Sequence, residues 1–451
     1  MKNIIKQETK EAKEIFGRIK RKDFSGNTGQ AIKNSSWQIA TTLIAKIGSL
    51  IFTIIIARLM LPELYGLYGL ALSTILILGI FSDIGIGTAL NTFLSKNIDK
   101  SPGKAKGYFK YLTKWRVALL SLSILLLVFL GAWLATTYYQ KPIYYALLAG
   151  VIYLPLTIFQ SHFTTIFTST NNFKPLLIKE IILQVMRITL IPLTIILFLS
   201  KIASHEVYLF WVFIVISICY FSAGAYLLLR IRMARPFKKA KATILSNSEK
   251  SDLRKFILPL TVTALSGGFF GFIDQFMLGR YVASQFLGFY QASFNLTTAA
   301  SAIVAFSSIA MFPILARLKG KRLEKGFKRG RNITILISTL AAIFTFLLAS
   351  PIIKLIYNSA YSTSIIYLKI LSVLIISFPL ITLYCTYYTS QKQTKTLSIL
   401  IISSTVLNII LNYIFINIGL QFSMSHAVIG ACTATIISRL GYLGGLIIFR
   451  R

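Results

Sequence analysis

Long apolar segments constrain the fold of this chain more than any other feature of its sequence. Runs of about 20 apolar residues recur from Ser35 to the C-terminus, and a helix of that length crosses the roughly 30 Å hydrocarbon core of a bilayer. Only 14% of the residues are charged and 55% are hydrophobic, which excludes an ordinary soluble protein. The sequence therefore predicts an all-α, polytopic membrane protein. Its apolar runs place about twelve transmembrane helices at 35–58, 64–90, 115–136, 143–169, 175–199, 206–229, 255–279, 285–315, 332–356, 363–389, 396–416 and 424–448.

The 48 basic residues are concentrated in alternate loops. Nine lie in 1–34, six in 91–114, eight in 230–254 and eight in 316–331, whereas each loop on the other side carries none or one. The positive-inside rule then places both termini and the basic loops in the cytoplasm, which predicts a multi-pass protein of the cell (cytoplasmic or inner) membrane. The net charge of +35 thus reflects topology and attraction to anionic lipid head groups. We expect no nucleic-acid binding, because no basic stretch is interleaved with aromatic residues on a folded module.

A short motif occurs twice, about half a chain length apart. The copies "ARLMLPELYGLYG" at 57–69 and "GRYVASQFLGFYQ" at 279–291 share an arginine, a glycine and a tyrosine, each pair 222 residues apart. Each half holds six predicted spans, so both halves start on the same side and the repeat is parallel, with its axis along the membrane normal. Two such pseudo-symmetric six-helix bundles can enclose a cavity and rock to give alternating access. The predicted parts are a basic cytoplasmic arm 1–34, an N-terminal bundle 35–229, a basic cytoplasmic linker 230–254 and a C-terminal bundle 255–451.

Three basic residues, Lys46, Arg187 and Arg439, fall well inside predicted spans. A charge at the bilayer centre costs about 2.5–3.5 kcal/mol on insertion scales, so each needs a partner or a water-filled cavity. We predict that the three line a cationic cavity for an anionic group such as a diphosphate, since arginine contacts phosphate bidentately and lysine acts as a point charge. The alternative is a set of ion pairs that only lock helices together, such as Glu180 with Arg187 or with Lys46.

Three of the thirteen acidic residues, Asp83, Glu180 and Asp274, also lie deep within predicted spans. They are candidates for binding a coupling proton or Na⁺, and equally for structural ion pairs with basic neighbours. Glycine-containing stretches adjoin two of them, "IGIG" after Asp83 and "GGFFGFI" before Asp274. Asn408 and Asn412 are four residues apart on one helical face, and we expect them to hydrogen-bond across helices.

No catalytic or cofactor-binding pattern accompanies these charges. The segment "PGKAKG" at 102–107 lacks the glycine spacing and the Ser/Thr of a phosphate-binding loop. The three cysteines fall inside predicted spans, and neither His162 nor His426 has a second ligand at metal spacing. We therefore expect no metal site, no cofactor and no enzymatic activity, since no acid pair or nucleophile constellation appears either.

Several stretches, taken in order, resemble one transporter family. "ARLMLPELYGLYGLALSTILILGIFSDIGIGTAL" at 57–90 is similar to the opening helices of polysaccharide-unit flippases, and "FIDQFMLGRYVASQFLGFYQASFNL" at 272–296 to the start of their second half. "VLNIILNYIFI" and "VIGACTATIIS", both within 406–438, resemble two of their late helices. With the six-plus-six plan, the resemblance extends over nearly the whole chain. It points to the multidrug/oligosaccharidyl-lipid/polysaccharide exporter superfamily, in the branch that includes O-antigen flippases.

The resemblance implies two six-helix bundles in a V that translocate polyprenyl-diphosphate-linked oligosaccharide from the cytoplasmic to the outer leaflet by alternating access, for cell-surface polysaccharide or glycan biosynthesis. The implied partners are that lipid-linked oligosaccharide, the lipid bilayer, a coupling H⁺ or Na⁺ and other glycan-assembly membrane proteins. One alternative is a cation-coupled multidrug or small-molecule antiporter on the same fold. Such an exporter of organic cations would favour an acidic cavity, whereas basic residues outnumber acids in these spans. Another alternative is a scaffold role in a glycan-assembly complex.

Overall fold

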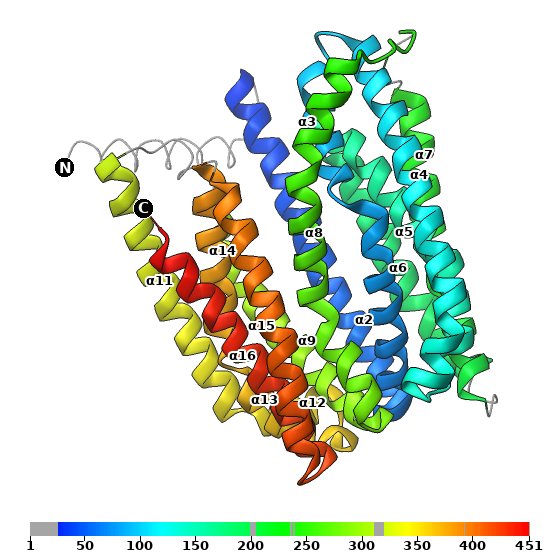
Figure 1. Ribbon diagram of the computed structural model, residues 1–451, viewed down its shortest axis with the longest axis vertical. Helices are drawn as coiled ribbons and strands as arrows, with labels where there is room; N and C mark the ends of the chain where they lie inside the picture. The colour runs from blue at the N-terminus through cyan, green and yellow to red at the C-terminus, as the bar shows by residue number, and fades with distance from the viewer. Residues whose placement is uncertain are drawn as a thin grey trace.

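The computed structural model describes residues 26–198, 204–234, 237, 240–310, 320–391 and 393–450, and every regular element within them is a helix. The helices form two bundles that lie side by side and converge toward one end of the molecule (Figure 1). The all-α, two-lobe architecture predicted from the apolar runs is therefore confirmed. Residues 1–25 of the predicted basic arm lie outside the described residues.

The N-terminal lobe begins with a helical hairpin. Its first element contains Leu61, whose φ of 58° is left-handed, directly before Pro62. Proline lacks an amide donor and disfavours helical backbone in the preceding residue, so the helix breaks there and the chain reverses. The elements are α2 (Gly26–Gly79), η1 (Ile80–Asp83), α3 (Ile86–Asn97), α4 (Pro102–Trp133), the π-helix η2 (Leu134–Tyr139), α5 (Tyr144–Ser169), α6 (Lys174–Leu197) and α7 (His205–Ala234).

The C-terminal lobe repeats this plan. Its first two helices are separated by a two-residue break at 282–283, at the place that corresponds to Leu61 in the first lobe. The elements are α8 (Asn247–Tyr281), α9 (Ser284–Ala310), α11 (Gly320–Leu347), α12 (Ala349–Tyr357), η4 (Ser359–Tyr361), α13 (Ser364–Leu371), α14 (Leu374–Ser390), α15 (Thr394–Leu420) and α16 (Met424–Ile448).

Each of the twelve predicted spans coincides with helix. Within the described residues, nine helices are long and apolar enough to cross a membrane, and the bent pair α13 and α14 makes a tenth. One of the nine, Ser36–Asp83, covers predicted span 35–58 from residue 36 and predicted span 64–90 as far as residue 83, and α9 follows predicted span 285–315 as far as residue 310. The protein is therefore a multi-pass membrane protein.

Three predicted spans are wrong in one respect, since each is interrupted. Span 64–90 breaks at η1, where Asp83 Oδ1 accepts a hydrogen bond from the Gly87 amide at 2.7 Å and Gly85 has a φ of 87°. Span 332–356 divides between α11 and α12, and span 363–389 bends by 41° between α13 and α14. Apolar composition predicts membrane depth but not such interruptions, because they depend on side-chain capping and tertiary packing.

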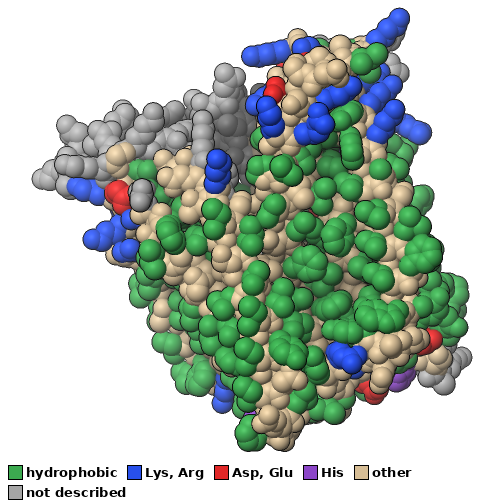
Figure 2. Space-filling model, viewed as in Figure 1, with side chains coloured by type: hydrophobic (Ala, Val, Ile, Leu, Met, Phe, Trp, Pro, Cys, Tyr) green, Lys and Arg blue, Asp and Glu red, His purple; other side chains and the backbone are tan. Residues whose placement is uncertain are grey.

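Basic side chains gather at one end of the molecule, which we call the basic end. Figure 2 shows Lys and Arg at the upper end of this face, over the helices α3, α4 and α8, above a broad apolar surface. Thr243, in the linker 230–254, contacts α4 here, and its amide donates to the Gly103 carbonyl at 3.0 Å. Lys104 and Glu249 form an ion pair at 2.9 Å. The start of α8 is thereby held on the N-terminal lobe.

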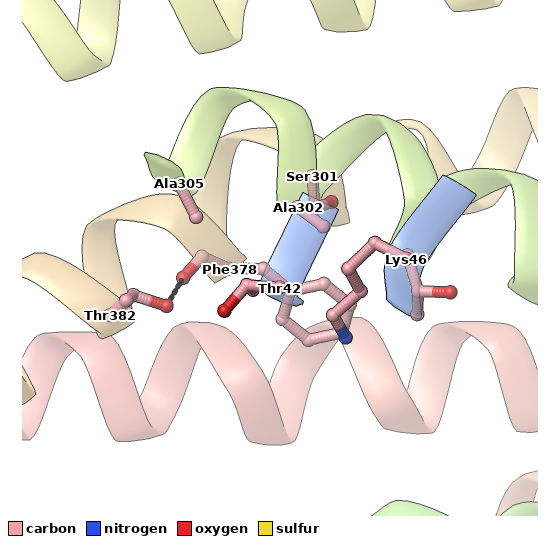
Figure 3. A pocket seen from close by; sticks show the side chains of 8 residues that line it. Thr42, Lys46, Ser301, Ala302, Ala305, Phe378 and Thr382 are labelled. Atoms are coloured by element: carbon pink, nitrogen blue, oxygen red, sulfur yellow. Dashed lines mark hydrogen bonds between the residues drawn. The ribbon is translucent and has the colours of Figure 1, made fainter. Parts of the chain in front are cut away.

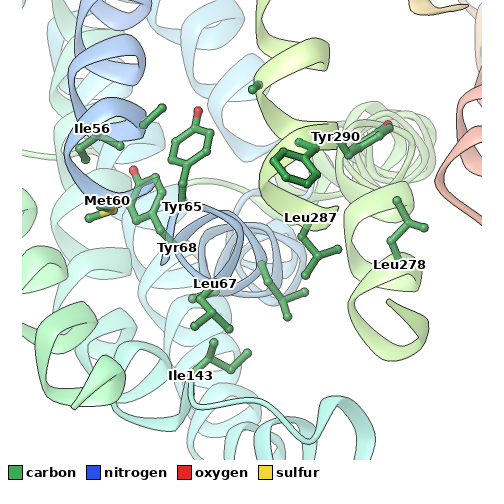
Figure 4. Close-up of a cluster of buried hydrophobic side chains, with 14 of the residues drawn as sticks. Ile56, Met60, Tyr65, Leu67, Tyr68, Ile143, Leu278, Leu287 and Tyr290 are labelled. Atoms are coloured by element: carbon green, nitrogen blue, oxygen red, sulfur yellow. The ribbon is translucent and has the colours of Figure 1, made fainter. Parts of the chain in front are cut away.

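The two copies of the repeated motif meet at the opposite end, which we call the motif end. A Cβ atom on Gly66 would collide with the Ser284 carbonyl, and one on Gly288 would collide with the Pro62 carbonyl. Ser284 lies 222 residues after Pro62 and therefore occupies the equivalent place in the second copy of the motif. The glycine of each copy thus approaches the equivalent residue of the other copy. Tyr65, Tyr68, Leu287 and Tyr290, from both copies, belong to one buried cluster (Figure 4). The glycines are thus required for the close approach of the lobes.

The motif arginines also cross between the lobes. Arg58 of α2 donates from Nε to the Ile356 carbonyl at 2.6 Å and from Nη2 to the Leu355 carbonyl, both in α12. Arg280 of α8 donates from Nη1 to the Tyr138 carbonyl at 2.6 Å, in η2. Each arginine therefore projects from the first span of its own lobe and binds the end of the third span of the other lobe. This reciprocal pair, which we call the arginine latch, holds the motif end closed.

Candidate functional site

A pocket of about 230 Å³ lies between the lobes. Its walls are α2 of the N-terminal lobe and α9 and α14 of the C-terminal lobe (Figure 3). Lys46 is its charged residue, and the side chain is exposed to the pocket. Among the described residues Lys46 forms no ion pair. The other lining residues are small, hydroxylic or aromatic: Thr42, Thr298, Ser301, Ala302, Ala305, Phe378 and Thr382.

Arg439 reaches the same pocket wall from α16. Its guanidinium carbon lies 5.2 Å from the ring centroid of Phe378 and 3.5 Å from that of Phe270, and Nη2 donates to the Phe270 carbonyl at 2.8 Å. Stacking on two rings stabilises the cation at a site with little water. Since Phe378 also lines the pocket of Lys46, one cation from each lobe adjoins the same aromatic wall. The arrangement can attract an anionic group into the space between the lobes.

Arg187 lies elsewhere. It projects from α6 and stacks on Phe52 of α2, with 3.9 Å between the guanidinium carbon and the ring centroid. Phe52 is fully buried in the N-terminal lobe, and Arg187 is not among the residues that line the pocket. Lys46 and Arg439 therefore both adjoin Phe378, whereas Arg187 stacks on a different ring, and neither arginine lines the pocket itself.

Glu180 pairs with its sequence neighbour. Lys179 Nζ lies 2.6 Å from Glu180 Oε2, and Gln184 Nε2 donates to Oε1 at 2.7 Å. Gln184 packs against Gly48 of α2, where any Cβ atom would come within 2.6 Å of it. The alternative pairs of Glu180 with Arg187 or Lys46 do not form, because Lys179 and Gln184 occupy both carboxylate oxygens.

Asp83 is the centre of a charged network in the N-terminal lobe. Arg116 Nη2 binds Asp83 Oδ2 at 2.6 Å, and the arginine side chain is only 3% exposed. Arg116 Nη1 lies 3.2 Å from His162 Nδ1, and His162 Nε2 lies 2.8 Å from the Thr113 hydroxyl. Asp83 is thus paired with a buried cation, in line with the ion-pair alternative. Arg116 was not predicted as a site residue, because it stands at the edge of predicted span 115–136. A basic residue at that place is expected to belong to the adjoining loop.

Asp274 has a different environment in the C-terminal lobe. Three neutral groups donate to its carboxylate: Asn412 Nδ2 at 2.7 Å, Tyr290 Oη at 2.8 Å and Thr435 Oγ1 at 2.5 Å. The side chain of Asn408 donates to Ser438 Oγ at 3.1 Å. The predicted cross-helix hydrogen bonds of Asn408 and Asn412 are therefore confirmed. Tyr290 and Thr435 were not predicted as partners, although Tyr290 stands in the repeated motif.

The charge of Asp274 is uncompensated at close range. Among the described residues no cation lies within ion-pair distance of it, and it is only 7% exposed. Arg439 interacts with it electrostatically from farther away. The side-chain oxygens of Asn408 and Asn412 are buried and accept no hydrogen bond from any residue that the structure describes. A buried carboxylate that is held by neutral donors and has no cation at close range can attract an added positive charge.

The comparisons with known proteins agree with this architecture. A family model described as a polysaccharide biosynthesis protein matches residues 31–319, well over half of the chain. The chain belongs to the polysaccharide biosynthesis protein family. A second model, MatE, matches residues 259–414 in the C-terminal lobe. No curated protein sequence matches the chain.

Solved structures of membrane transporters share the fold of this family member. A lipid II flippase, MurJ, in an inward closed conformation, is 16% identical with a TM-score of 0.69, over 90% of this chain and 86% of that one. An inward-facing multidrug resistance MATE transporter of the MOP superfamily is 14% identical with a TM-score of 0.66, over 92% and 99%. A MOP superfamily transporter from Pyrococcus furiosus, described as having a binding pocket of reverse polarity, is 12% identical with a TM-score of 0.54, over 93% and 95%. The fold is that of transporters and flippases rather than of enzymes.

Proposed function

We propose that this protein is a flippase that moves polyprenyl-diphosphate-linked oligosaccharide units from the cytoplasmic to the outer leaflet of the cell membrane. The observation that carries the proposal is the pair of cations around Phe378, Lys46 from one lobe and Arg439 from the other. A diphosphate supplies the complementary negative charge, and the hydroxyl groups of the pocket suit a polar sugar head group. Membership of the polysaccharide biosynthesis protein family supports this assignment.

The proposed orientation in the membrane rests on the charge distribution. The basic end faces the cytoplasm under the positive-inside rule, so both termini are cytoplasmic and the arginine latch faces outward. With the latch closed, the pocket at Lys46 receives its substrate from the cytoplasmic side. Opening of the latch and closure of the basic end then expose the head group to the outer side. Arg187, stacked on Phe52, contributes positive charge from within the N-terminal lobe rather than direct contact.

Asp274 is the residue we assign to ion coupling. Uptake of H⁺ or Na⁺ neutralises its carboxylate and so weakens its attraction for Arg439. Arg439 is then freer to bind the diphosphate beside Phe378. Ion binding in the C-terminal lobe and substrate binding between the lobes are thereby linked through one guanidinium group.

A second candidate function is cation-coupled antiport of drugs or other small molecules. The MatE match to residues 259–414 and the MATE structures favour it. The pocket supports the flippase over the antiporter, because an organic cation would meet Lys46 and no acid among the described lining residues.

The test is a leaflet assay with the purified protein in liposomes. A fluorescent polyprenyl-diphosphate oligosaccharide is added, and its crossing is followed with a membrane-impermeant quencher or glycosidase. Lys46→Ala should slow crossing by about ten- to a hundredfold, the equivalent of about 1.5–3 kcal/mol for a lost charge-assisted contact. Lys354→Ala, which removes an exposed lysine of α12 outside the pocket, is the matched control. Absence of crossing by the wild-type protein, with uptake of a fluorescent organic cation instead, would establish the antiporter.

A further inference from the structure

A second and larger cavity, of about 530 Å³, opens between α3 and α4 of the N-terminal lobe and α8 of the C-terminal lobe. We call it the lateral groove. Trp115 and Leu119 of α4 face Leu258 of α8 across it, and Arg254 and Lys255 lie nearer the basic end. Leu258 is 70% exposed and Trp115 is 51% exposed, so the apolar walls are open to a ligand from the bilayer.

The lateral groove is separate from the pocket at Lys46. Its base is sealed where α8 crosses η1, because Thr261 Oγ1 donates to the Ile84 carbonyl at 3.0 Å. Farther along α8, the rings of Phe81 and Phe269 pack edge to face at 6.4 Å. None of the residues that line the groove lines the pocket. A lipid chain can therefore lie in the groove while the lobes remain in contact along this seam.

The chemistry of the groove changes along α8. Leu258 follows Arg254 by four residues and Lys255 by three, so the apolar and the cationic positions lie on one side of the helix. Both cations are exposed, and among the described residues neither forms an ion pair. Two adjacent cations match the multiple negative charge of a diphosphate, and the apolar walls below them match an isoprenoid chain.

We propose that the lateral groove is a loading site for the substrate lipid, in which Arg254 and Lys255 bind its diphosphate and the walls bind its isoprenoid tail. This inference rests on the proposed flippase function and adds a subsite to it. The groove lies in the half of the membrane nearer the basic end, where the donor leaflet would be. Because its walls belong to different lobes, movement of the lobes deforms the groove and releases the lipid for transfer.

The test uses the full-length protein in nanodiscs and a photoactivatable polyprenyl diphosphate without sugars. Mass spectrometry should place its crosslinks on Trp115, Leu119 or the α8 segment around Leu258. Unlabelled polyprenyl diphosphate should compete with this labelling, whereas phosphatidylglycerol at the same concentration should not. Arg254→Gln combined with Lys255→Gln should weaken the competition roughly three- to tenfold, as expected for two exposed charge contacts. The matched control is Lys325→Gln with Lys328→Gln, which removes two exposed charges of α11 outside the groove.

A groove-filling variant, Leu258→Trp, separates the loading site from the flippase function. Its exposed position permits the larger ring without a change in the core. It should abolish groove labelling and slow crossing in the leaflet assay, while Leu336→Trp, at a 61% exposed position of α11, should do neither. Wild-type rates of crossing by Leu258→Trp, or equal competition by phosphatidylglycerol, would overturn the loading site and leave the flippase intact. Loss of crossing by the wild-type protein itself would instead refute the proposed function.

Discussion

The two lobes are alike where they touch and unlike in the acids within their spans, of which Asp83 is half-buried and Asp274 is buried. At the motif end, each lobe contributes a glycine for close approach and an arginine that binds backbone carbonyls of the other lobe. Deep in the N-terminal lobe, Asp83 is paired with the guanidinium of Arg116 at 2.6 Å. In the C-terminal lobe, Asp274 is held by three neutral donors. The repeat is thus retained at the contact between the lobes, whereas the two acids, which do not occupy equivalent positions, have different partners.

The difference identifies which acid can respond to an ion. A carboxylate already neutralised by a buried cation gains little from a proton or Na⁺, since the pair would have to be broken first. A carboxylate among neutral donors gains the full interaction with an added positive charge. By this argument Asp83 is expected to have a structural role, and Asp274 is the proposed coupling residue. Two substitutions test this contrast and a third tests the contact that the lobes share, in decreasing order of the free-energy change expected.

Asp83→Ala should cause the largest loss of stability. It leaves the Arg116 guanidinium buried, 3% exposed and without its counter-ion, which typically costs about 3–5 kcal/mol. The measurement is the denaturant midpoint of the purified protein in detergent. The double variant Asp83→Ala with Arg116→Leu should recover most of the loss, because no uncompensated charge remains. Asp252→Ala, an exposed acid of α8, serves as the control. An unchanged midpoint for Asp83→Ala would return Asp83 to the candidates for ion coupling.

Arg58→Ala should have an intermediate effect, on the equilibrium between closed and open lobes rather than on folding. It removes two exposed hydrogen bonds from a charged donor to α12 carbonyls, and exposed contacts of a charged group contribute about 0.2–1 kcal/mol each. Pulsed EPR between labels at Gln140 and Phe422, both exposed near the motif end, should report a larger open population. Arg280→Ala should shift the same distance distribution less, because it removes one carbonyl contact. The control is Lys354→Ala. No shift in either arginine variant would mean that the glycine contacts alone close this end.

Much of this architecture could be predicted from the sequence, because bilayer-length apolar runs and alternating basic loops depend on composition alone. The residues Lys46, Arg187 and Asp274 stand out for the same reason, as charges within apolar runs. Their orientation could not be predicted. Lys46 and Arg187 both lie in the middle of spans, yet only Lys46 lines the pocket, because the rotation of each helix is set by packing against its neighbours.

The partners of Asp83 and Asp274 could not be predicted from the sequence either. Arg116 lies 33 residues from Asp83, and Thr435 lies 161 residues from Asp274. No local spacing connects such residues. Tertiary structure alone shows that one acid meets a guanidinium and the other meets hydroxyl and amide groups. The sequence leaves two roles open for each acid, an ion pair or a coupling site. The choice between them depends on those partners.

Asp274→Asn should have the smallest effect on stability and a selective effect on transport. The amide has nearly the shape of the carboxylate and can accept from Asn412 as before, so the cost should be about 1 kcal/mol, the size of one ordinary hydrogen bond. It carries no charge, so it can neither take up a proton nor attract Na⁺ or Arg439. The leaflet assay, run with and without pH and Na⁺ gradients, should therefore show a crossing rate that no longer responds to either. The isosteric control Asp252→Asn should keep the response. A gradient response that survives in Asp274→Asn would place the coupling ion elsewhere, and the contrast between Asp83 and Asp274 would then concern folding alone.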